Sequence, residues 1–321
     1  MEKDSARQNW VDGSGQSHQG LVHQVVGNFS VIDCECCRFK HVVPLPTPQE
    51  LETVYSHEYY TQEKPFYIDQ YLEDKAWWDA VYAERYDVLE GHLGGRQGSI
   101  LDVGSGPGLF LAMGRTRGWD AKGVEPSIKA SDYSQRVLGL DVKNIFLDAE
   151  TAPTLGQFDV VNMGEVLEHL SDPAGMLRLV NGLIKQDGLL TLVVPNDFNP
   201  LQLILRDHLG FKPWWVAPPH HLNYFSHESL KALVERLGFE VLHMESTFPI
   251  DIFLMMGKNY IGNDPLGREV HGLRKTLDQN LFDAGATELR RKLYGAFAHL
   301  GLGREIVLYA RKVNGGGSGH E

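Results

Sequence analysis

Short apolar runs alternate with helical stretches from about residue 98 to the end of the chain. This alternation is typical of parallel βαβ units, in which a helix leads from each strand back across the sheet to the next strand. The pattern predicts strands at residues 99–103, 120–124, 143–147, 158–163, 188–194, 239–245 and 305–312. We therefore expect an α/β fold with an open, mostly parallel sheet within residues 96–313.

Two segments interrupt this alternation. Residues 196–228 lie between the fifth predicted strand and the next helix, and residues 247–304 lie between the last two strands and have a mostly helical pattern. Ligands bind open α/β sheets at the carboxyl ends of the strands. Because the first segment leaves the sheet at that edge, we expect it to form a substrate lid, and we expect the second to form a helical insertion.

Residues 1–95 are expected to form an extension ahead of the sheet. Residues 1–30 are polar and glycine-rich without a clear period, and the sequence P-L-P-T-P that ends at Pro48 predicts a stiff connection. From residue 49 to 92 the pattern is helical and rich in aromatic side chains. We expect most of these to pack on the sheet, but Tyr59 and Tyr60 could instead close over a bound ligand.

Composition narrows the class of protein. The chain has 321 residues, of which 42% are hydrophobic, and a net charge of −12, which argues against binding nucleic acid. No apolar stretch approaches the roughly 18 to 20 residues of a membrane span. The N-terminus has no apolar signal region, and the few cysteines are too close together for a disulfide framework. We expect a cytoplasmic protein without a membrane partner and a flexible tail at 314–321; the oligomeric state stays open.

The most informative segment is S-I-L-D-V-G-S-G-P-G, at residues 99–108. An apolar strand ends there in glycines at alternate positions, and a helical stretch follows at once. Glycine accepts positive φ and has no Cβ, so the backbone can press against a ligand at the helix N-terminus. A dinucleotide fingerprint would have glycine at 109, where this chain has Leu109. The predicted ligand-binding residues of this segment are Asp102, Gly104, Ser105, Gly106 and Gly108.

Further motifs make the chain similar to the class I S-adenosylmethionine-dependent methyltransferases. They are V-E-P-S, F-L-D-A-E, F-D-V-V-N-M-G-E-V-L-E-H-L-S-D-P, L-L-T-L-V-V-P-N and H-L-N-Y-F-S-H-E-S-L-K-A-L-V-E-R-L-G-F-E-V. With the glycine loop, they extend over roughly residues 75–246. The resemblance implies an active methyltransferase with a Rossmann-like, doubly wound sheet of seven strands, the last of them antiparallel.

The resemblance also implies where the cofactor, S-adenosylmethionine, is held. The glycine loop would lie along its methionine part, Glu125 would accept both ribose hydroxyls, and Asp148 would accept from the adenine amino group. Glu125 could instead be a solvated strand end, and Asp148 a simple turn residue. Asp102 would fix the glycine loop or a water on the ligand. The further predicted cofactor contacts are Pro126, Ala149 and Glu165.

Candidate catalytic groups follow the fourth and fifth predicted strands. Glu165 and His169 have i, i+4 spacing, so we expect them to share a helix face and to form a wall of the methyl-transfer site. Capping and packing is the alternative, and we favour it for Glu168. Histidine titrates near neutral pH and can therefore act as a general base.

The lid contains P-P-H-H-L-N-Y-F-S, which is similar to H-E-H-L-S-Y-F-S of the sugar C-methyltransferases. In those enzymes the second histidine acts as base, which implies that role for His221. Tyr224 matches their tyrosine and is a predicted substrate contact. His220 replaces their glutamate, a departure that leaves the substrate and the tuning of the base open, and we expect His220 to contact the substrate as a member of the catalytic group. His221 could instead only pack under the lid. Trp214 and Trp215 could stack on a substrate ring or sugar, or merely anchor the lid.

Cys34 and Cys37 have the C-x-x-C spacing of half a zinc site. The sugar C-methyltransferases carry an N-terminal zinc module with a second cysteine pair, which this chain lacks. His18 and His23, or His41, would have to complete the tetrahedron. Structural zinc and buried, reduced thiols therefore both stay open.

Together these features predict methyl transfer from S-adenosylmethionine to the O, N or C atom of a small-molecule or sugar-type acceptor. Two alternatives belong to other classes: a nicotinamide-dependent oxidoreductase on a similar sheet, and a non-catalytic protein that binds S-adenosylmethionine. Leu109 counts against the first alternative, and the intact acidic residues at the strand ends count against the second.

Overall fold

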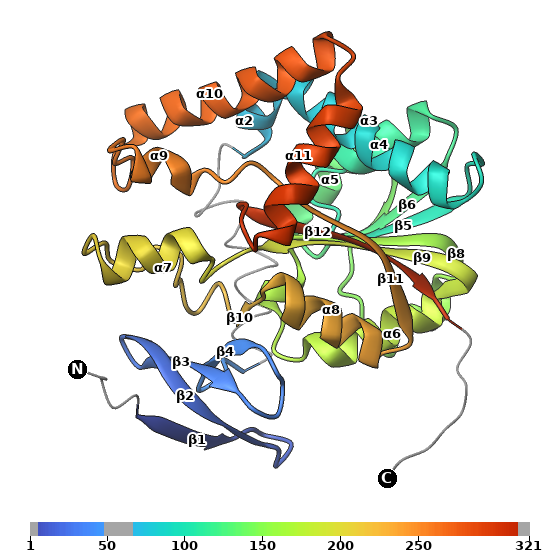
Figure 1. Ribbon diagram of the computed structural model, residues 1–321. Coiled ribbons are helices and arrows are strands. Elements are labelled where there is room, and N and C mark those ends of the chain that lie inside the picture. Colours follow the sequence, from blue (N-terminus) through green and yellow to red (C-terminus); the bar gives the residue numbers. More distant parts are fainter. Residues whose placement is uncertain (1–5, 48–66, 314–321) are drawn as a thin grey trace.

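The computed structural model describes residues 6–47 and 67–313, and these contain two sheets (Figure 1). The larger has seven strands in the order β11-β12-β9-β8-β5-β6-β7. All neighbours from β9 to β7 are parallel, and β12 is antiparallel to both β9 and β11. The strands are β5 (Ser99–Val103), β6 (Asp120–Val124), β7 (Asp141–Lys143), β8 (Phe158–Gly164), β9 (Ile184–Pro195), β11 (Phe239–Ser246) and β12 (Glu305–Lys312). The predicted doubly wound sheet is confirmed.

One predicted strand, at 143–147, is wrong in its position. The edge strand β7 already ends at Lys143. The Asn144 side chain then turns back and donates hydrogen bonds to the carbonyl oxygens of Glu125 and Pro126, at 2.8 and 2.9 Å. This contact takes the following apolar residues 145–147 out of the sheet and into the lining of a cavity.

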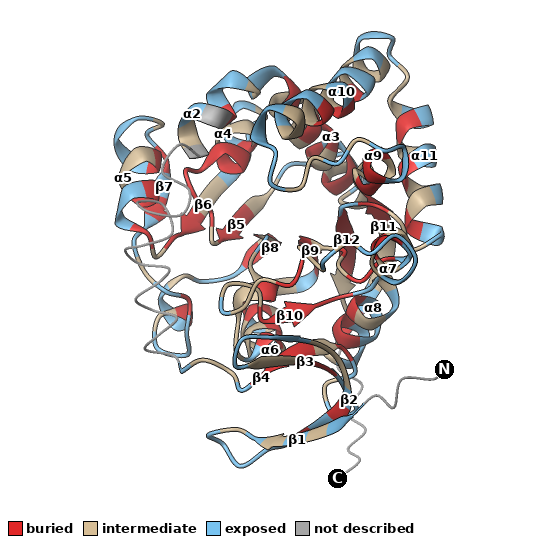
Figure 2. Ribbon diagram, turned by 90° about the vertical axis from the view of Figure 1, so that its left-hand side faces the viewer, coloured by how far each residue is buried: buried red, intermediate tan, exposed pale blue. Residues whose placement is uncertain are grey.

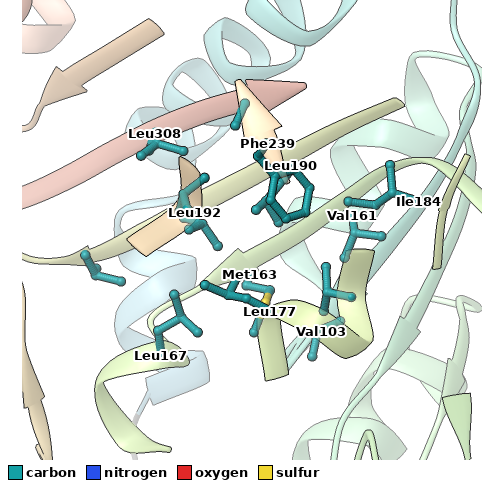
Figure 3. Packing of buried hydrophobic residues seen from close by; sticks show 14 of the residues in the cluster. Val103, Val161, Met163, Leu167, Leu177, Ile184, Leu190, Leu192, Phe239 and Leu308 are labelled. Carbon is teal, nitrogen blue, oxygen red and sulfur yellow. The ribbon is translucent and has the colours of Figure 1, made fainter. Parts of the chain in front are cut away.

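Helices cover both faces of the large sheet (Figure 1). Side chains alternate along each strand, so Ile100 packs beneath α3 and α4 while Leu101 packs toward α6 and α8. Figure 3 shows the second of these layers, in which Val161, Met163 and Leu190 meet Leu177 of α6. Because both faces are covered, the central strands are almost continuously apolar. The helices named here are α3 (Lys75–His92), α4 (Leu109–Thr116), α6 (Pro173–Leu183) and α8 (His227–Arg236).

Local sequence signals fix where these helices begin. Asp172 caps α6 by accepting a hydrogen bond from Gly175 N at 2.8 Å, and Pro173 follows at the first helical position. Ser226 and Ser229 form a reciprocal capping box at the start of α8. The remaining α-helices are α2 (Tyr67–Glu73), α5 (Ile128–Arg136), α7 (Pro200–Asp207), α9 (Asp251–Met255), α10 (Asp264–Asp283) and α11 (Thr287–His299).

The segment 247–304 contains α9, α10 and α11, and a buried charge cluster holds it to α3. Arg290 of α11 forms ion pairs with Glu84 of α3 and with Asp278 of α10. Trp77 of α3 donates its indole N–H to Asp278 at 2.9 Å. Part of the aromatic N-terminal segment therefore packs on this insertion instead of on the sheet. None of the helices within residues 67–313 combines the length and the apolar composition that crossing a membrane requires.

The smaller sheet was not expected from the sequence. Its five strands have the order β1-β2-β3-β4-β10, and all pairs are antiparallel. Most side chains of β2 are exposed or only half-buried, so the apolar alternation that marks a strand is weak there. The strands are β1 (Arg7–Val11), β2 (Ser17–Val26), β3 (Phe29–Cys34), β4 (Lys40–Val43) and β10 (Asn223–Tyr224).

Strand β10 belongs to the predicted lid, far from the other four strands in the sequence. It is an edge strand of the small sheet, and Figures 1 and 2 both place it between the other four strands and the large sheet. Tyr59, Tyr60 and the tail at 314–321 lie outside the described residues.

Candidate functional site

A cavity of about 760 Å³ opens at the carboxyl ends of β5, β6 and β8. This volume is in the range of small-molecule sites. Tyr82, Arg85 and Asn162 line it in addition to residues that the sequence predicted. The predicted residues in its lining are Asp102, Gly104, Ser105, Gly106, Glu125, Pro126, Asp148, Ala149, Glu165 and His169. The structure thus brings most of the proposed cofactor residues to one place.

The glycine loop has the backbone conformation that its sequence predicts. Gly104 and Gly108 have φ values of +69° and +81°. A Cβ at Gly104 would lie 2.7 Å from Val166 Cγ2, and one at Gly108 would lie 2.6 Å from Leu140 Cδ1. Gly108 caps α4 and is not part of the cavity lining, so its contribution is to set the turn. Only glycine fits both positions without strain.

Glu125 ties the glycine loop to the next strand. It is only 4% exposed, and its Oε2 and Oε1 accept hydrogen bonds from Gly106 N and Ser127 N, both at 2.8 Å. Burial raises the pKa of the Glu125 carboxyl to about 7, even though these two hydrogen bonds favour the charged form. Each carboxylate oxygen can accept a further hydrogen bond from a ligand.

Asp102 lies at the base of the loop. Asn162 donates to its Oδ1 at 2.7 Å, and burial raises the pKa of the Asp102 carboxyl to about 7. The two residues face each other across the parallel pair β5–β8. Asn162 was not predicted, although a polar residue within the apolar stretch V-V-N-M is a signal for it.

Asp148 is a turn residue, which was the alternative to its predicted contact with adenine. It also lines the cavity. Its Oδ1 accepts hydrogen bonds from Thr151 N at 2.7 Å, from Thr151 Oγ1 at 2.9 Å and from Glu150 N at 2.9 Å. The bonds from Thr151 lower the pKa of this exposed carboxyl. A contact with adenine stays a prediction.

The helix face expected for Glu165 and His169 does not exist. Glu165 follows the end of β8 with a φ of +55°, and His169 ends the 3-10 turn η3 (Leu167–His169). The α-helix starts only at Pro173 of α6, because Leu170 is extended and Asp172 supplies the cap. Glu165 and His169 still line the cavity, but a left-handed residue and a tight turn bring them there.

The lid histidines lie beside the cavity wall. His169 Nδ1 is 2.7 Å from the carbonyl oxygen of His220, and the rings of His169 and His221 are 5.1 Å apart between centroids. His221 Nδ1 also lies 3.8 Å from Asp197 Oδ2. His220 and His221 are not part of the cavity lining itself. Asp197, just after β9, was missed; its signal is an acidic residue at the ligand edge of a strand.

Two predicted substrate residues lie elsewhere. Trp215 is 5% exposed and packs in the apolar cluster of the lid, with its ring 5.7 Å from that of Phe198. The Tyr224 hydroxyl donates to the His221 carbonyl at 3.0 Å and accepts from Ala217 N at 3.3 Å. Neither side chain lines the cavity, so the structure favours lid anchoring over substrate stacking for Trp215.

Comparison with known proteins decides the family. The family described as "Methyltransferase domain" matches residues 76–244, more than half of the 321 residues. The chain belongs to the class I S-adenosylmethionine-dependent methyltransferases. The family and the enzyme class that the sequence predicted, a class I methyltransferase, are confirmed.

Two relatives are named ubiquinone biosynthesis O-methyltransferases. The one from Acinetobacter baylyi (strain ATCC 33305 / BD413 / ADP1) is 26% identical over 128 residues, which are 35% of this chain and 54% of the relative. The one from Stutzerimonas stutzeri (strain A1501) is 27% identical over 189 residues, 50% of this chain and 80% of the relative. The match with the first of these thus spans only about half of that protein.

Among solved structures, the chain is similar to the plantazolicin methyltransferase BamL in complex with a triazolic desmethylPZN analog and SAH. The TM-score is 0.52 at 15% identity, and the alignment covers 83% of this chain and 95% of that one. At this identity the likeness shows the fold alone.

The cavity fits the cofactor of this family. Its backbone cradle at residues 104–106 has no room for a Cβ at Gly104, and the Glu125 carboxylate follows directly on the neighbouring strand. A ribose-bearing ligand needs two such features. One is a glycine loop whose backbone can approach it closely, and the other is an acidic residue at the end of the next strand that can accept its ribose hydroxyls.

A second candidate site lies in the small sheet. His18, Cys34, Cys37 and His41 each place one ligand atom within 4.8 Å of all the others. His18 Nδ1 is 3.2 Å from His41 Nε2, 3.4 Å from Cys37 Sγ and 3.8 Å from Cys34 Sγ. Tetrahedral zinc separates two nitrogens by about 3.3 Å, and nitrogen from sulfur by about 3.5 Å. These spacings match those of zinc ligands, and His18 and His41 are the two histidines that would complete the half site of Cys34 and Cys37.

The second ring nitrogen of each histidine in this cluster also has a polar contact. His41 Nδ1 lies 2.9 Å from the Val42 carbonyl oxygen, and His18 Nε2 lies 3.3 Å from Asp12 Oδ2. Such outer contacts fix the tautomer and orientation of metal-binding histidines. His23, an alternative ligand at the sequence level, instead faces Asp33 at 3.5 Å.

Proposed function

We propose that the protein transfers the methyl group of S-adenosylmethionine to a hydroxyl oxygen of a small-molecule or sugar-type acceptor, with His221 as general base. The observation that carries this proposal is the histidine pair. His169 lines the cofactor cavity, and the ring of His221, a residue of the lid, lies 5.1 Å from the ring of His169. The names of the two relatives support oxygen as the acceptor atom.

When bound, S-adenosylmethionine supplies a methyl group on a positively charged sulfur, which an oxygen nucleophile can attack. The glycine loop and Glu125 would hold it, with Asp102 and Asp148 at the edges of the same cavity. His221 would take the proton of the acceptor hydroxyl, and the Asp197 carboxylate 3.8 Å away would stabilise the resulting imidazolium. Positioning of the acceptor under the lid would supply much of the remaining acceleration.

A panel of small phenols, sugars and amines, incubated with the full chain and S-adenosylmethionine, tests this function. We expect release of S-adenosylhomocysteine with a phenol or a sugar, and mass-spectrometric fragmentation that places the methyl group on oxygen. A product methylated on nitrogen or carbon would contradict the acceptor atom and leave the family assignment unchanged.

The raised pKa of Glu125 predicts that cofactor binding depends on pH. Hydroxyl donors favour the ionised carboxylate, which with a pKa of about 7 is mostly protonated at pH 6 and mostly ionised at pH 8. Affinity for S-adenosylhomocysteine should therefore fall by roughly tenfold as the pH is lowered from 8 to 6. Calorimetric titrations at both pH values measure this. Glu125→Gln, which cannot ionise, should make the profile shallower, and the remaining slope belongs to Asp102, whose pKa is also raised to about 7. Equal affinities of the unaltered protein at pH 6 and 8 would contradict the assignment.

We also propose that His18, Cys34, Cys37 and His41 hold one structural zinc ion. A closed set of four nitrogen and sulfur ligands is typical of structural zinc, whereas a catalytic site keeps a position open. The cytoplasmic location and the lack of a nucleic-acid partner stay predictions.

A further inference from the structure

The acceptor lid is part of the same sheet as the metal cluster. Asn223 of β10 pairs with His41 of β4, and Val42 N donates to the Leu222 carbonyl oxygen at 2.9 Å. A proposed metal ligand is therefore the direct strand partner of a lid residue, and His221 is only two residues before that partner.

The other side of this lid segment is attached to the cofactor cavity. Leu222 N donates to the Glu168 carbonyl oxygen at 2.7 Å. The Asn223 side chain donates to the carbonyl oxygens of Leu167 and Leu170, at 2.9 and 2.7 Å. Residues 167–170 include the turn that carries His169 into the cavity wall. The lid strand is thus held between the metal cluster and the wall of the cavity.

The loop between the proposed metal ligands Cys37 and His41 makes further contacts with the lid and with α8. Phe39, between Cys37 and His41, packs its buried ring 5.0 Å from that of Phe225, which directly follows β10. Arg236 of α8 donates to the Cys37 carbonyl oxygen at 3.1 Å. The ligand loop therefore contacts both the end of the lid and the helix after it.

The candidate ligands lie on the side of the small sheet with the smaller buried cluster, which consists of Ile32, Cys34 and Val43. On the other side, Val31 and Val42 share an apolar cluster with lid residues that include Leu222. A metal ion would add a cross-link between β2, β3 and β4 to this packing, and its binding free energy would contribute to the folding free energy of the sheet.

We infer that the Cys₂His₂ centre is a clamp on the acceptor lid: metal bound there fixes β4 against β10 and so holds His221 beside His169. This inference rests on the zinc site and the base proposed above. It assigns the N-terminal sheet a role in positioning the acceptor side of the site, separate from cofactor binding.

Hydrogen–deuterium exchange of the full chain tests the clamp, with zinc bound and after zinc is removed by a chelator. Removal should raise the exchange rate of amides in 214–224 by at least about tenfold, because their protection depends on local opening. The glycine loop at 99–108 should exchange as before, and affinity for S-adenosylhomocysteine should change by less than about twofold. Adding zinc back should restore the protection of the lid.

Variants provide matched controls. Cys34→Ser should lose the zinc ion and show the exchange pattern of the metal-free protein. Cys36→Ser changes the exposed cysteine of the same turn, which is not part of the cluster, and should keep both the zinc ion and the protected lid.

Three results would overturn the clamp: about one zinc ion per chain whose removal leaves 214–224 protected, equal loosening of 99–108 and 214–224, or no zinc in a protein whose lid is already protected. None of these three results bears on whether the protein transfers a methyl group, so failure of the clamp can be told apart from failure of the proposed function. A protein that shows the zinc-dependent lid but transfers no methyl group to any acceptor would confirm the clamp and contradict the proposed catalysis.

Discussion

Replacing His221 by alanine is expected to lower turnover by about 10² to 10⁴, the usual contribution of a general base. The His221 ring lies 5.1 Å from that of His169 in the cavity wall, and its Nδ1 lies 3.8 Å from the carboxylate of Asp197, which would stabilise a proton taken from the acceptor. Affinity for the cofactor should hardly change, because His221 does not line the cavity. Initial rates at saturating acceptor, measured as release of S-adenosylhomocysteine, and calorimetry give the two quantities separately.

His208→Ala is the matched control, because His208 is an exposed histidine of the same lid segment, and its turnover should stay at the level of the unaltered protein. Near-normal turnover of His221→Ala would eliminate His221 as a required base. It would direct attention to His169 and His220, or to an acceptor that is already a good nucleophile. A large loss of cofactor affinity would instead make His221 a structural lid residue.

Glu125→Ala should weaken the binding of S-adenosylhomocysteine by about 1.5 to 3 kcal/mol, the range for hydrogen bonds to a charged group. Two effects contribute. The ribose would lose its acceptor, and the amide of Gly106 would lose the oxygen that holds the glycine loop in place. Calorimetric titration at pH 8, where the carboxylate is mostly ionised, measures the change.

Glu150→Ala controls for charge, since it removes an exposed carboxylate near the same edge of the cavity without touching its lining. Its affinity should equal that of the unaltered protein. If Glu125→Ala bound the ligand as tightly as this control, the proposed contact with the ribose would be wrong, and Glu125 would only support the loop.

The large sheet could be predicted because its signals are local. The run Ile100–Val103, for example, is buried on both faces, and the next element of the chain is the helix α4. The signal for the glycine loop is local too. Gly104 has a positive φ and no room for a Cβ, so few other residue types can occupy that position. These parts of the cofactor site lie where the sequence indicated.

The parts that were missed or left open depend on contacts between distant segments. The candidate metal cluster joins His18, Cys34 and His41 from three strands, and spacing alone could not choose among His18, His23 and His41 as ligands. Asp197 and His221 lie at opposite ends of the segment between β9 and β10, and only the folded lid brings them to 3.8 Å. The expected helix face of Glu165 and His169 failed because a single left-handed residue ends the strand before any helix begins.

Titration of the full chain with S-adenosylhomocysteine, and separately with NAD, tests the central claim most directly. We predict one molecule of S-adenosylhomocysteine bound per chain, in competition with S-adenosylmethionine, and no binding of NAD. The chain has leucine where a dinucleotide loop has its third glycine, and the cavity is built around the Glu125 carboxylate. Binding of NAD without binding of S-adenosylhomocysteine would contradict the account.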